Sequence, residues 1–382
     1  MFVALRDLKH ARGRFVLMSV VIVLITFLVT FLASLTAGLA RESTSAVTDL
    51  PADHLAFSMP AADDAPEFTA SRVTQEQWEG WARKPGVASA EPLGVATTRA
   101  ASGSTTAAVT ALGVAPGTDL VPGDGGDGGD GGDAGDAGAD VEPGTVVLTP
   151  GAADALDVGA GDTVTLGGQR LTVARTVDAD QSFSHTPAVW TTLEDWQAVG
   201  ARGSGATADG PVATVVALTT TGVGGVGGAE LTAADGDLGT TTVTTPDARS
   251  AVSSFVGENT SLTTMQAFLL VISALVVGAF FTVWTISRTG DVAVLKALGA
   301  STGYLVRDAL GQAAVLLVGG VAIGTALTAA GAALLPDAVP VVLTTATTLV
   351  PAAGLVVLGL VGAGVAVARV ARVDPHAALA AR

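Results

Sequence analysis

Four long apolar segments constrain the fold of this chain more than any other feature. They are residues 15–40, 264–287, 309–335 and 349–368, and none of them contains a charged side chain. A helix needs about 20 mostly apolar residues to cross the hydrocarbon core of a bilayer. The first run is too long for the apolar part of a signal peptide, which favours a span over a cleaved leader. We therefore expect an all-α membrane domain of four transmembrane helices.

The segment between the first two runs has a different composition. Residues 41–263 contain 30 of the 35 acidic residues and only 9 of the 19 basic ones. Such a charged block of more than two hundred residues is long enough to fold on its own beside the membrane. We expect an α+β domain inserted between the first and second transmembrane helices.

Basic residues near the span ends predict the orientation. They lie in segments 1–14, 288–308 and 369–382. The short loop 336–348 contains no basic residue, and its one charged residue is Asp337. Loops rich in Lys and Arg remain in the cytoplasm. Both termini are therefore expected in the cytoplasm and residues 41–263 outside it, in a multi-pass protein of the cytoplasmic membrane.

The first fourteen residues repeat apolar side chains at helical spacing. Phe2, Leu5 and Leu8 are three residues apart, with basic residues between them. This pattern favours a cytoplasmic amphipathic helix on the membrane surface, and the alternative is a plain basic flank.

Local patterns predict several elements in the outer block. Residues 145–148 favour a strand and 150–156 a short helix, and alternation on both sides of Gly167-Gly168 predicts a hairpin. Thr74 and Thr192 are suitable N-cap residues for two further short helices. Residues 122–140 are rich in Gly and Asp but lack the apolar residues of a calcium-binding repeat, so we expect a flexible, solvated loop.

The outer block offers little for catalysis. The chain has no cysteine, which excludes disulfides and thiolate ligands, and the histidines of the block are His54 and His185. None of the three lysines belongs to a Gly-x-x-x-x-Gly-Lys-Ser/Thr loop, which binds ATP phosphates in P-loop ATPases. We therefore expect no enzyme activity, no bound metal and no cofactor in this chain.

The segment after the second span carries the most specific pattern. Val292, Leu295 and Leu298 share one helical face, Val294 adds to it, and Gly299 favours a helix end. The result is a short amphipathic helix that requires a partner, which is either a groove on a cytoplasmic protein or the lipid surface.

This segment, Arg288-Thr-Gly-Asp-Val-Ala-Val-Leu-Lys-Ala-Leu-Gly-Ala-Ser301, resembles the signature of the FtsX-like, or MacB-type, ABC transporter permeases. Asp291, Val292 and Lys296 replace the Glu, Ile and Arg that are frequent there. The order of spans and outer domain and the tail 372–379 are also similar to that family. The resemblance implies that the short helix is a coupling helix, formed by Arg288, Asp291, Val292, Val294, Leu295, Lys296, Leu298 and Gly299.

The resemblance also implies partners. Two copies of a cytoplasmic ABC ATPase would use ATP and Mg²⁺, and a second permease copy would complete a homodimer in the lipid bilayer. Nucleic acid is not an expected partner.

The cargo is less constrained by the residues. Glu42 and Met265, near the outer ends of the first two spans, are candidate contacts for an amphipathic substrate such as a lipid, peptide, drug or haem, and interfacial flanking charge is the alternative for Glu42. Two functions remain open. One is export, and the other is an FtsX-like signalling subunit that controls an external cell-wall hydrolase.

Overall fold

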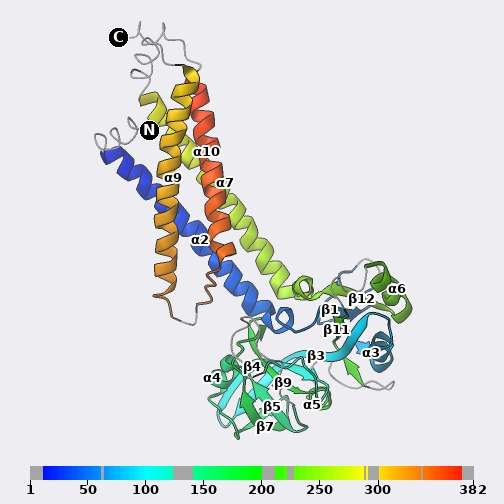
Figure 1. The fold of residues 1–382 in the computed structure, drawn as a ribbon. Coiled ribbons are helices and arrows are strands. Elements are labelled where there is room, and N and C mark those ends of the chain that lie inside the picture. The colour runs from blue at the N-terminus through cyan, green and yellow to red at the C-terminus, as the bar shows by residue number, and fades with distance from the viewer. Residues whose placement is uncertain are drawn as a thin grey trace. The chain divides into compact units, whose positions relative to one another are not determined.

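The protein divides into two units in a computed structural model (Figure 1). The structure describes residues 12–61, 64–123, 141–199, 211–221, 228–287, 290, 301–336 and 339–371. One unit comprises Met1–Leu39 and Asn259–Arg382, and the other comprises Ala40–Glu258. The expected N-terminal amphipathic helix, the Gly/Asp loop, the coupling helix and the basic tail lie largely outside the described residues.

Four helices of the described chain are long and apolar enough to span a membrane. They are α2 (Arg12–Thr48), α7 (Ser253–Ser287), α9 (Thr302–Ala332) and α10 (Thr345–Ala371). The helices α2 and α7 have 37 and 35 residues, many more than the ~20 that a span requires. The boundary between the two units falls inside both helices, after Leu39 in α2 and after Glu258 in α7.

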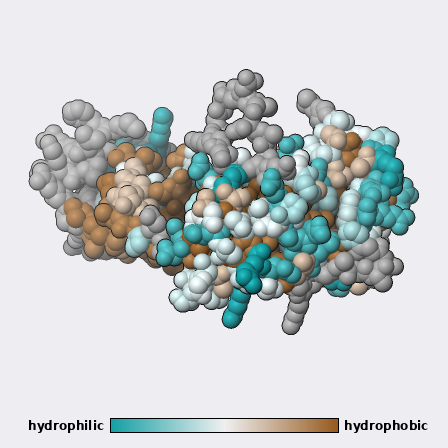
Figure 2. All heavy atoms as spheres, turned by 90° about the horizontal axis from the view of Figure 1, so that it is seen from below, coloured by the Kyte–Doolittle hydropathy of each residue, from teal (hydrophilic) through white to brown (hydrophobic). Residues whose placement is uncertain are grey.

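The helical unit has a core of its own and an apolar exterior. Ile22, Phe281 and Leu317 are buried between the helices, whereas Leu275 and Val283 of α7 are each 68% exposed. The surface of this unit is largely brown in Figure 2, and that of the other unit is mostly teal and white. Apolar side chains on both faces are expected of helices whose outer face contacts lipid.

The other unit, which we call the outer domain, is built on β-strands. They are β1 (His54–Ser58), β2 (Val73–Thr74), β3 (Val87–Ser102), β4 (Thr105–Val114), β5 (Thr145–Leu148), β6 (Thr163–Leu166), β7 (Gln169–Thr176), β8 (Ser182–Phe183), β9 (Thr186–Thr192), β10 (Val212–Ala213), β11 (Val215–Thr220) and β12 (Thr240–Thr244).

One long strand organises the sheet. The order is β12-β1-β11-β3-β4-β9-β5-β7-β6, and β6 also pairs with the far end of β3 through Ala100 and Ala101. This last pairing closes β3, β4, β9, β5, β7 and β6 into a small barrel, with Val146, Leu166 and Val189 among the buried residues of its core. The first half of β3 instead extends the open part of the sheet.

Short helices cover the sheet. They are α3 (Gln75–Ala82), α4 (Pro150–Leu156), α5 (Leu193–Ala198), α6 (Gly228–Leu238) and the 3-10 helix η1 (Thr245–Ala251). Thr74 and Gln77 form a capping box at α3, and the Thr192 hydroxyl accepts a hydrogen bond from the Asp195 amide at α5. Both caps were predicted from the sequence, as were β5, α4 and the β6–β7 hairpin.

Candidate functional site

A short turn of the outer domain joins β8 to β9. Phe183 pairs with Thr186, so Ser184 and His185 form a two-residue loop. Both have positive φ, at 51° and 61°. Two positive φ angles are typical of a type I′ hairpin turn, which favours Asn and Gly. A serine and a histidine in this conformation are strained, and contacts elsewhere must stabilise them.

The end of helix α2 supplies part of that support. The Ser184 amide donates to the Ser43 carbonyl at 2.9 Å, and the His185 amide donates to the Glu42 carbonyl at 3.2 Å. The Ser182 amide donates to the Ser45 hydroxyl at 2.9 Å. Three backbone amides around the turn therefore bind one stretch of α2.

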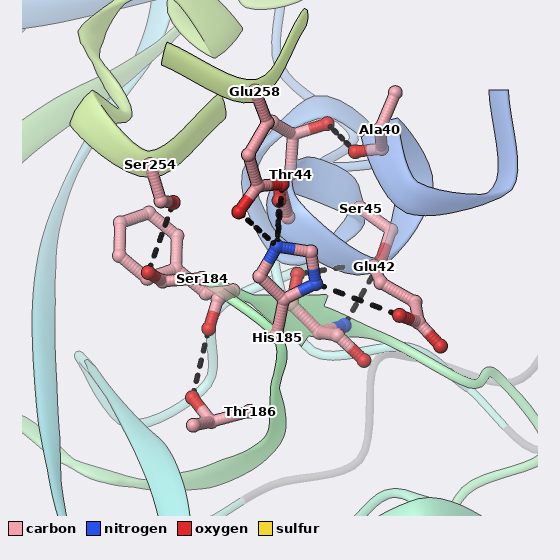
Figure 3. Close-up of polar contacts among 12 residues, drawn as sticks. Ala40, Glu42, Thr44, Ser45, Ser184, His185, Thr186, Ser254 and Glu258 are labelled. Atoms are coloured by element: carbon pink, nitrogen blue, oxygen red, sulfur yellow. Dashed lines mark hydrogen bonds and ion pairs between the residues drawn. The ribbon is translucent and has the colours of Figure 1, made fainter. Parts of the chain in front are cut away.

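The imidazole of His185 adds contacts on both sides (Figure 3). Its Nε2 lies 2.8 Å from Glu258 Oε2, at the start of α7, and 2.8 Å from the Ser43 hydroxyl. Its Nδ1 lies 3.5 Å from Glu42 Oε2. The Ser184 hydroxyl also contacts the Ser254 hydroxyl of α7 at 3.0 Å. We call this cluster of Glu42, Ser43, Ser184, His185, Ser254 and Glu258 the His185 joint, because it binds α2, the hairpin and α7 together.

A rigid apolar layer adjoins the joint. The ring of Phe183 makes an edge contact with Phe68, whose ring makes another with Phe57, at centroid distances of 5.3 and 4.9 Å. Val47 of α2 and Phe255 of α7 belong to the same buried cluster. Interiors packed in this way transmit strain because they have low compressibility. The hairpin is therefore packed into the core of the outer domain as well as hydrogen-bonded to α2 and α7.

The joint does not have the arrangement of a metal site. Glu42 and Glu258 face opposite nitrogens of one ring, so the three groups do not converge on a point. Within the part of the chain that the structure describes, no group of three His, Asp or Glu side chains is suited to a metal ion. The arrangement instead connects the hairpin to the end of α2 and the start of α7.

Comparison with known families agrees with a long outer domain between two spanning helices. Residues 15–224 match the family described as the MacB-like periplasmic core domain, and residues 264–375 match the FtsX-like permease C-terminal family. The chain is a MacB-type, FtsX-like ABC transporter permease. The permease thus has four helices able to span a membrane and an extracytoplasmic α+β domain between the first two of them.

Relatives of known description cover part of the permease. The putative hemin transport system permease protein HrtB of Staphylococcus epidermidis is 30% identical over 141 residues, which are 37% of this chain and 40% of the relative. The protein of the same name from Staphylococcus haemolyticus is 30% identical over 128 residues, which are 34% and 36% of the two chains.

Two solved structures resemble the permease at low identity. The extracellular domain of the transporter YknZ from Gram-positive bacteria has a TM-score of 0.33 at 16% identity and covers 50% of this chain and 98% of its own. The periplasmic region of MacB from Actinobacillus actinomycetemcomitans has a TM-score of 0.34 at 10% identity and covers 56% and 97%.

The structure places only some of the residues predicted as sites. Glu42 lies in the His185 joint with 44% of its side chain exposed, and Met265, in the helical unit, is 59% exposed. The predicted coupling residues Arg288, Asp291, Val292, Val294, Leu295, Lys296, Leu298 and Gly299 lie outside the described residues. His185 was noted in the sequence, but its contact with Glu258 was not predicted, because the two residues lie 73 positions apart in the chain.

Proposed function

We propose that this permease is the non-hydrolysing, force-transmitting subunit of an ABC exporter. A separate cytoplasmic ATPase binds the amphipathic helix within 288–308 and drives a movement of the extracytoplasmic domain. Two permease copies pair with two ATPase copies, and both termini of each permease are cytoplasmic. The basic loops and the family's architecture support this arrangement.

The observation that carries the proposal is the continuity of α7. This helix runs unbroken from Ser253 to Ser287, directly before the proposed coupling helix. A helix is stiff along its axis because each residue is bonded to the next turn. A displacement at the cytoplasmic end is therefore delivered to the residues at its start, where Ser254 and Glu258 bind the hairpin of the outer domain.

A triple substitution tests the ATPase contact. Replacing Val294, Leu295 and Leu298 by Asp places charges on the apolar face and is expected to abolish co-purification with the proposed partner ATPase. The control is Ser301→Asp, which adds charge in the same loop but preserves an N-cap, because the Ser301 side chain already accepts the Tyr304 amide. Undiminished co-purification of the triple variant would refute the coupling role.

The cargo that we propose is an amphipathic molecule, with hemin as the first compound to test. The names of the partial relatives suggest hemin, and the chain offers an exposed thioether, Met265, and a partly exposed carboxylate, Glu42. Methionine sulfur is an established axial ligand of haem iron.

Hemin binding is measured on the purified full-length permease by its Soret band. We expect a shift on addition of hemin, and a weaker shift for Glu42→Gln and for Met265→Leu than for the control Glu79→Gln on α3. An unshifted band removes hemin as cargo. Loss of an external cell-wall hydrolase activity on deletion of the permease, with no change in export, would instead establish the signalling role.

A further inference from the structure

We propose that α2 slides along α9 by one helical turn, in the direction of its own C-terminal end, and that residues 339–344 hold it in the observed register. We call these residues, which directly precede α10, the strap. The inference rests on the proposed function for its purpose, because α2 continues to Thr48 and would deliver the displacement to the His185 joint.

The contact between α2 and α9 repeats every four residues. Its members on α2 are buried and form one row, which comprises Met18, Ile22, Thr26 and Thr30. Their partners on α9, in order from Ile22, are Gly320, Gly324 and Thr328. A Cβ added at either glycine would lie 2.6 Å from its partner side chain, and the oxygens of the hydroxyl pair are 2.6 Å apart. The two helices therefore pack in parallel with one constant offset.

A shift of α2 by four residues replaces each contact by one of the same kind. The new pairs would be Met18 with Gly320, Ile22 with Gly324 and Thr26 with Thr328. Both glycines would again receive an aliphatic or threonine-sized side chain, and the Thr328 hydroxyl would again face a threonine. The shift is about 6 Å along the axis with a rotation of about 40°. Steps of one turn between packed elements are a known form of switching between two discrete states.

The threonine hydroxyls do not oppose this shift. Thr26 donates to the Ile22 carbonyl and Thr30 donates to the Thr26 carbonyl, each at 2.8 Å and within α2 itself. These bonds move with the helix, so neither donor loses its partner when the residue across the contact changes. This matters because an unsatisfied polar group is costly between helices in lipid.

The strap stabilises the observed register. The Val342 amide donates to the Ser34 carbonyl at 3.1 Å, and a Cβ added at Gly38 would overlap the Pro340 carbonyl. Ser34 and Gly38 continue the buried row of α2 at the same spacing of four. A slide of one turn would carry Ser34 into the place of Gly38, so the strap would have to withdraw by the width of a side chain. The strap therefore opposes the slide, and it closes on α2 because residue 38 is a glycine.

The hydroxyl of Ser34 favours the shifted register. Ser34 is fully buried, and within the part of the chain that the structure describes its hydroxyl has no hydrogen-bond partner. A buried donor without an acceptor costs at least as much as a hydrogen bond contributes. In the shifted register this hydroxyl would lie beside the Pro340 carbonyl, which can accept its hydrogen bond. Each register therefore has one bond that the other lacks.

Pairs of introduced cysteines distinguish the registers, since the chain contains no cysteine of its own. In the full-length permease, Thr30→Cys with Thr328→Cys reports the observed register, and Thr26→Cys with Thr328→Cys reports the shifted one. Ser34→Cys with Thr328→Cys is the matched control, because residue 34 is one turn from residue 30 on the other side. The rate of disulfide formation is measured for each pair with and without Gly38→Ala, which adds a methyl group against the strap.

Gly38→Ala should destabilise the observed register alone, because the slide carries residue 38 past the strap. We expect it to raise the rate of the Thr26 pair about fivefold, the effect of one lost hydrogen bond, and to leave the Ser34 pair unchanged or slower. The Thr30 pair should still form, which shows that the variant folds. An unchanged Thr26 pair, or an equal rise in both mismatched pairs, would overturn the slide.

A second variant tests the slide without changing the strap contact. Ser34→Ala removes the hydroxyl that only the shifted register satisfies, so it should lower the rate of the Thr26 pair about fivefold and leave the Thr30 pair unchanged. An undiminished Thr26 pair would contradict the proposal even if Gly38→Ala did not fold. These measurements need neither ATPase nor substrate, so the slide can fail while the exporter function holds, and the reverse.

Discussion

In both the outer domain and the helical unit, another residue packs closely against a glycine, but the residue and the physical reason differ. A Cβ added at Gly113 on β4 would lie 2.4 Å from the Cβ of Trp196, which is 1% exposed. A Cβ added at Gly324 on α9 would lie 2.6 Å from Thr26 Cβ and 2.8 Å from the Val23 carbonyl of α2. The first contact buries a large ring, and the second brings two helix backbones together.

The surrounding solvent explains the contrast. Burial of an aromatic ring from water is among the largest single favourable contributions to a domain core. Between helices in lipid this driving force is absent, because the tails are as apolar as leucine, and close packing at small residues takes its place. The outer domain should therefore be most sensitive to lost bulk, and the helical unit to added bulk.

The largest expected effect is on Trp196. Trp196→Ala should destabilise the outer domain by about 3–5 kcal/mol, because it leaves a cavity where the buried ring packs on Gly94 of β3 and Gly113 of β4. The free energy is measured from hydrogen exchange of the β4 and β9 amides in the full-length permease. Trp78→Ala on α3, whose side chain is only partly buried, serves as the control and should cost less. Equal losses would mean that the barrel core is not the stabilising element.

Added bulk tests the helical unit. Gly324→Ala should cost about 1–3 kcal/mol, since the new methyl meets the backbone of α2. Gly319→Ala, on the same helix, meets nothing within 4 Å and should be neutral or slightly stabilising. Thermal unfolding of the detergent-solubilised permease compares the two variants. If Gly319→Ala lowers the thermal stability as much as Gly324→Ala does, close packing at Gly324 is not what makes that position sensitive.

Acid should lower the stability of the outer domain more than that of the helical unit. Hydrogen bonds from the Thr220 amide and hydroxyl lower the pKa of Asp53 below its ordinary value, although slight desolvation opposes them. Because the folded pKa is the lower one, this carboxylate stabilises the outer domain above about pH 4, and the stabilisation is lost as pH falls through the folded value. The contribution is under about 1 kcal/mol, because Asp53 is exposed.

Asp53→Asn should therefore reduce the loss of outer-domain stability between about pH 5 and 3 and leave the helical unit unchanged. Hydrogen exchange at β1 and β11 measures the first, and protection of α9 amides the second. The same acid sensitivity in variant and parent would show that the bonds to Thr220 do not stabilise the ionised form.

Patterns that act over short distances were readable in the sequence. Hydropathy predicted the four helices, and the cap at Thr192 and the hairpin at Gly167-Gly168 were predicted from neighbouring residues. The strand β3 was not predicted. Its alanine-rich sequence contains Pro92 and favours no strand, and pairing with β4 and β11 over its length overrides that weak local preference.

The His185 joint could not be predicted from the sequence for a related reason. Glu42, His185 and Glu258 are far apart in the chain, and each alone resembles an ordinary surface residue. The local sequence at the turn does not indicate a hairpin either. Ser184 and His185 stand where a type I′ turn usually has Asn and Gly. The helix ends that stabilise this turn can be identified only when the tertiary contacts are known.

Another small effect is expected from two pairs of hydroxyl groups with the same oxygen–oxygen distance, one in each unit. Thr30 and Thr328 join α2 to α9 at 2.6 Å, and Thr110 and Thr186 join β4 to β9 at 2.6 Å. Thr328→Val should cost about 0.6 kcal/mol, the average for such bonds between membrane helices. Thr30 retains its bond to the Thr26 carbonyl, which keeps the loss small. Thr186→Val should cost about 1 kcal/mol. If the membrane pair costs several times more than the outer pair, lipid strengthens the hydrogen bond, and polar contacts would join close packing as a main force in the helical unit.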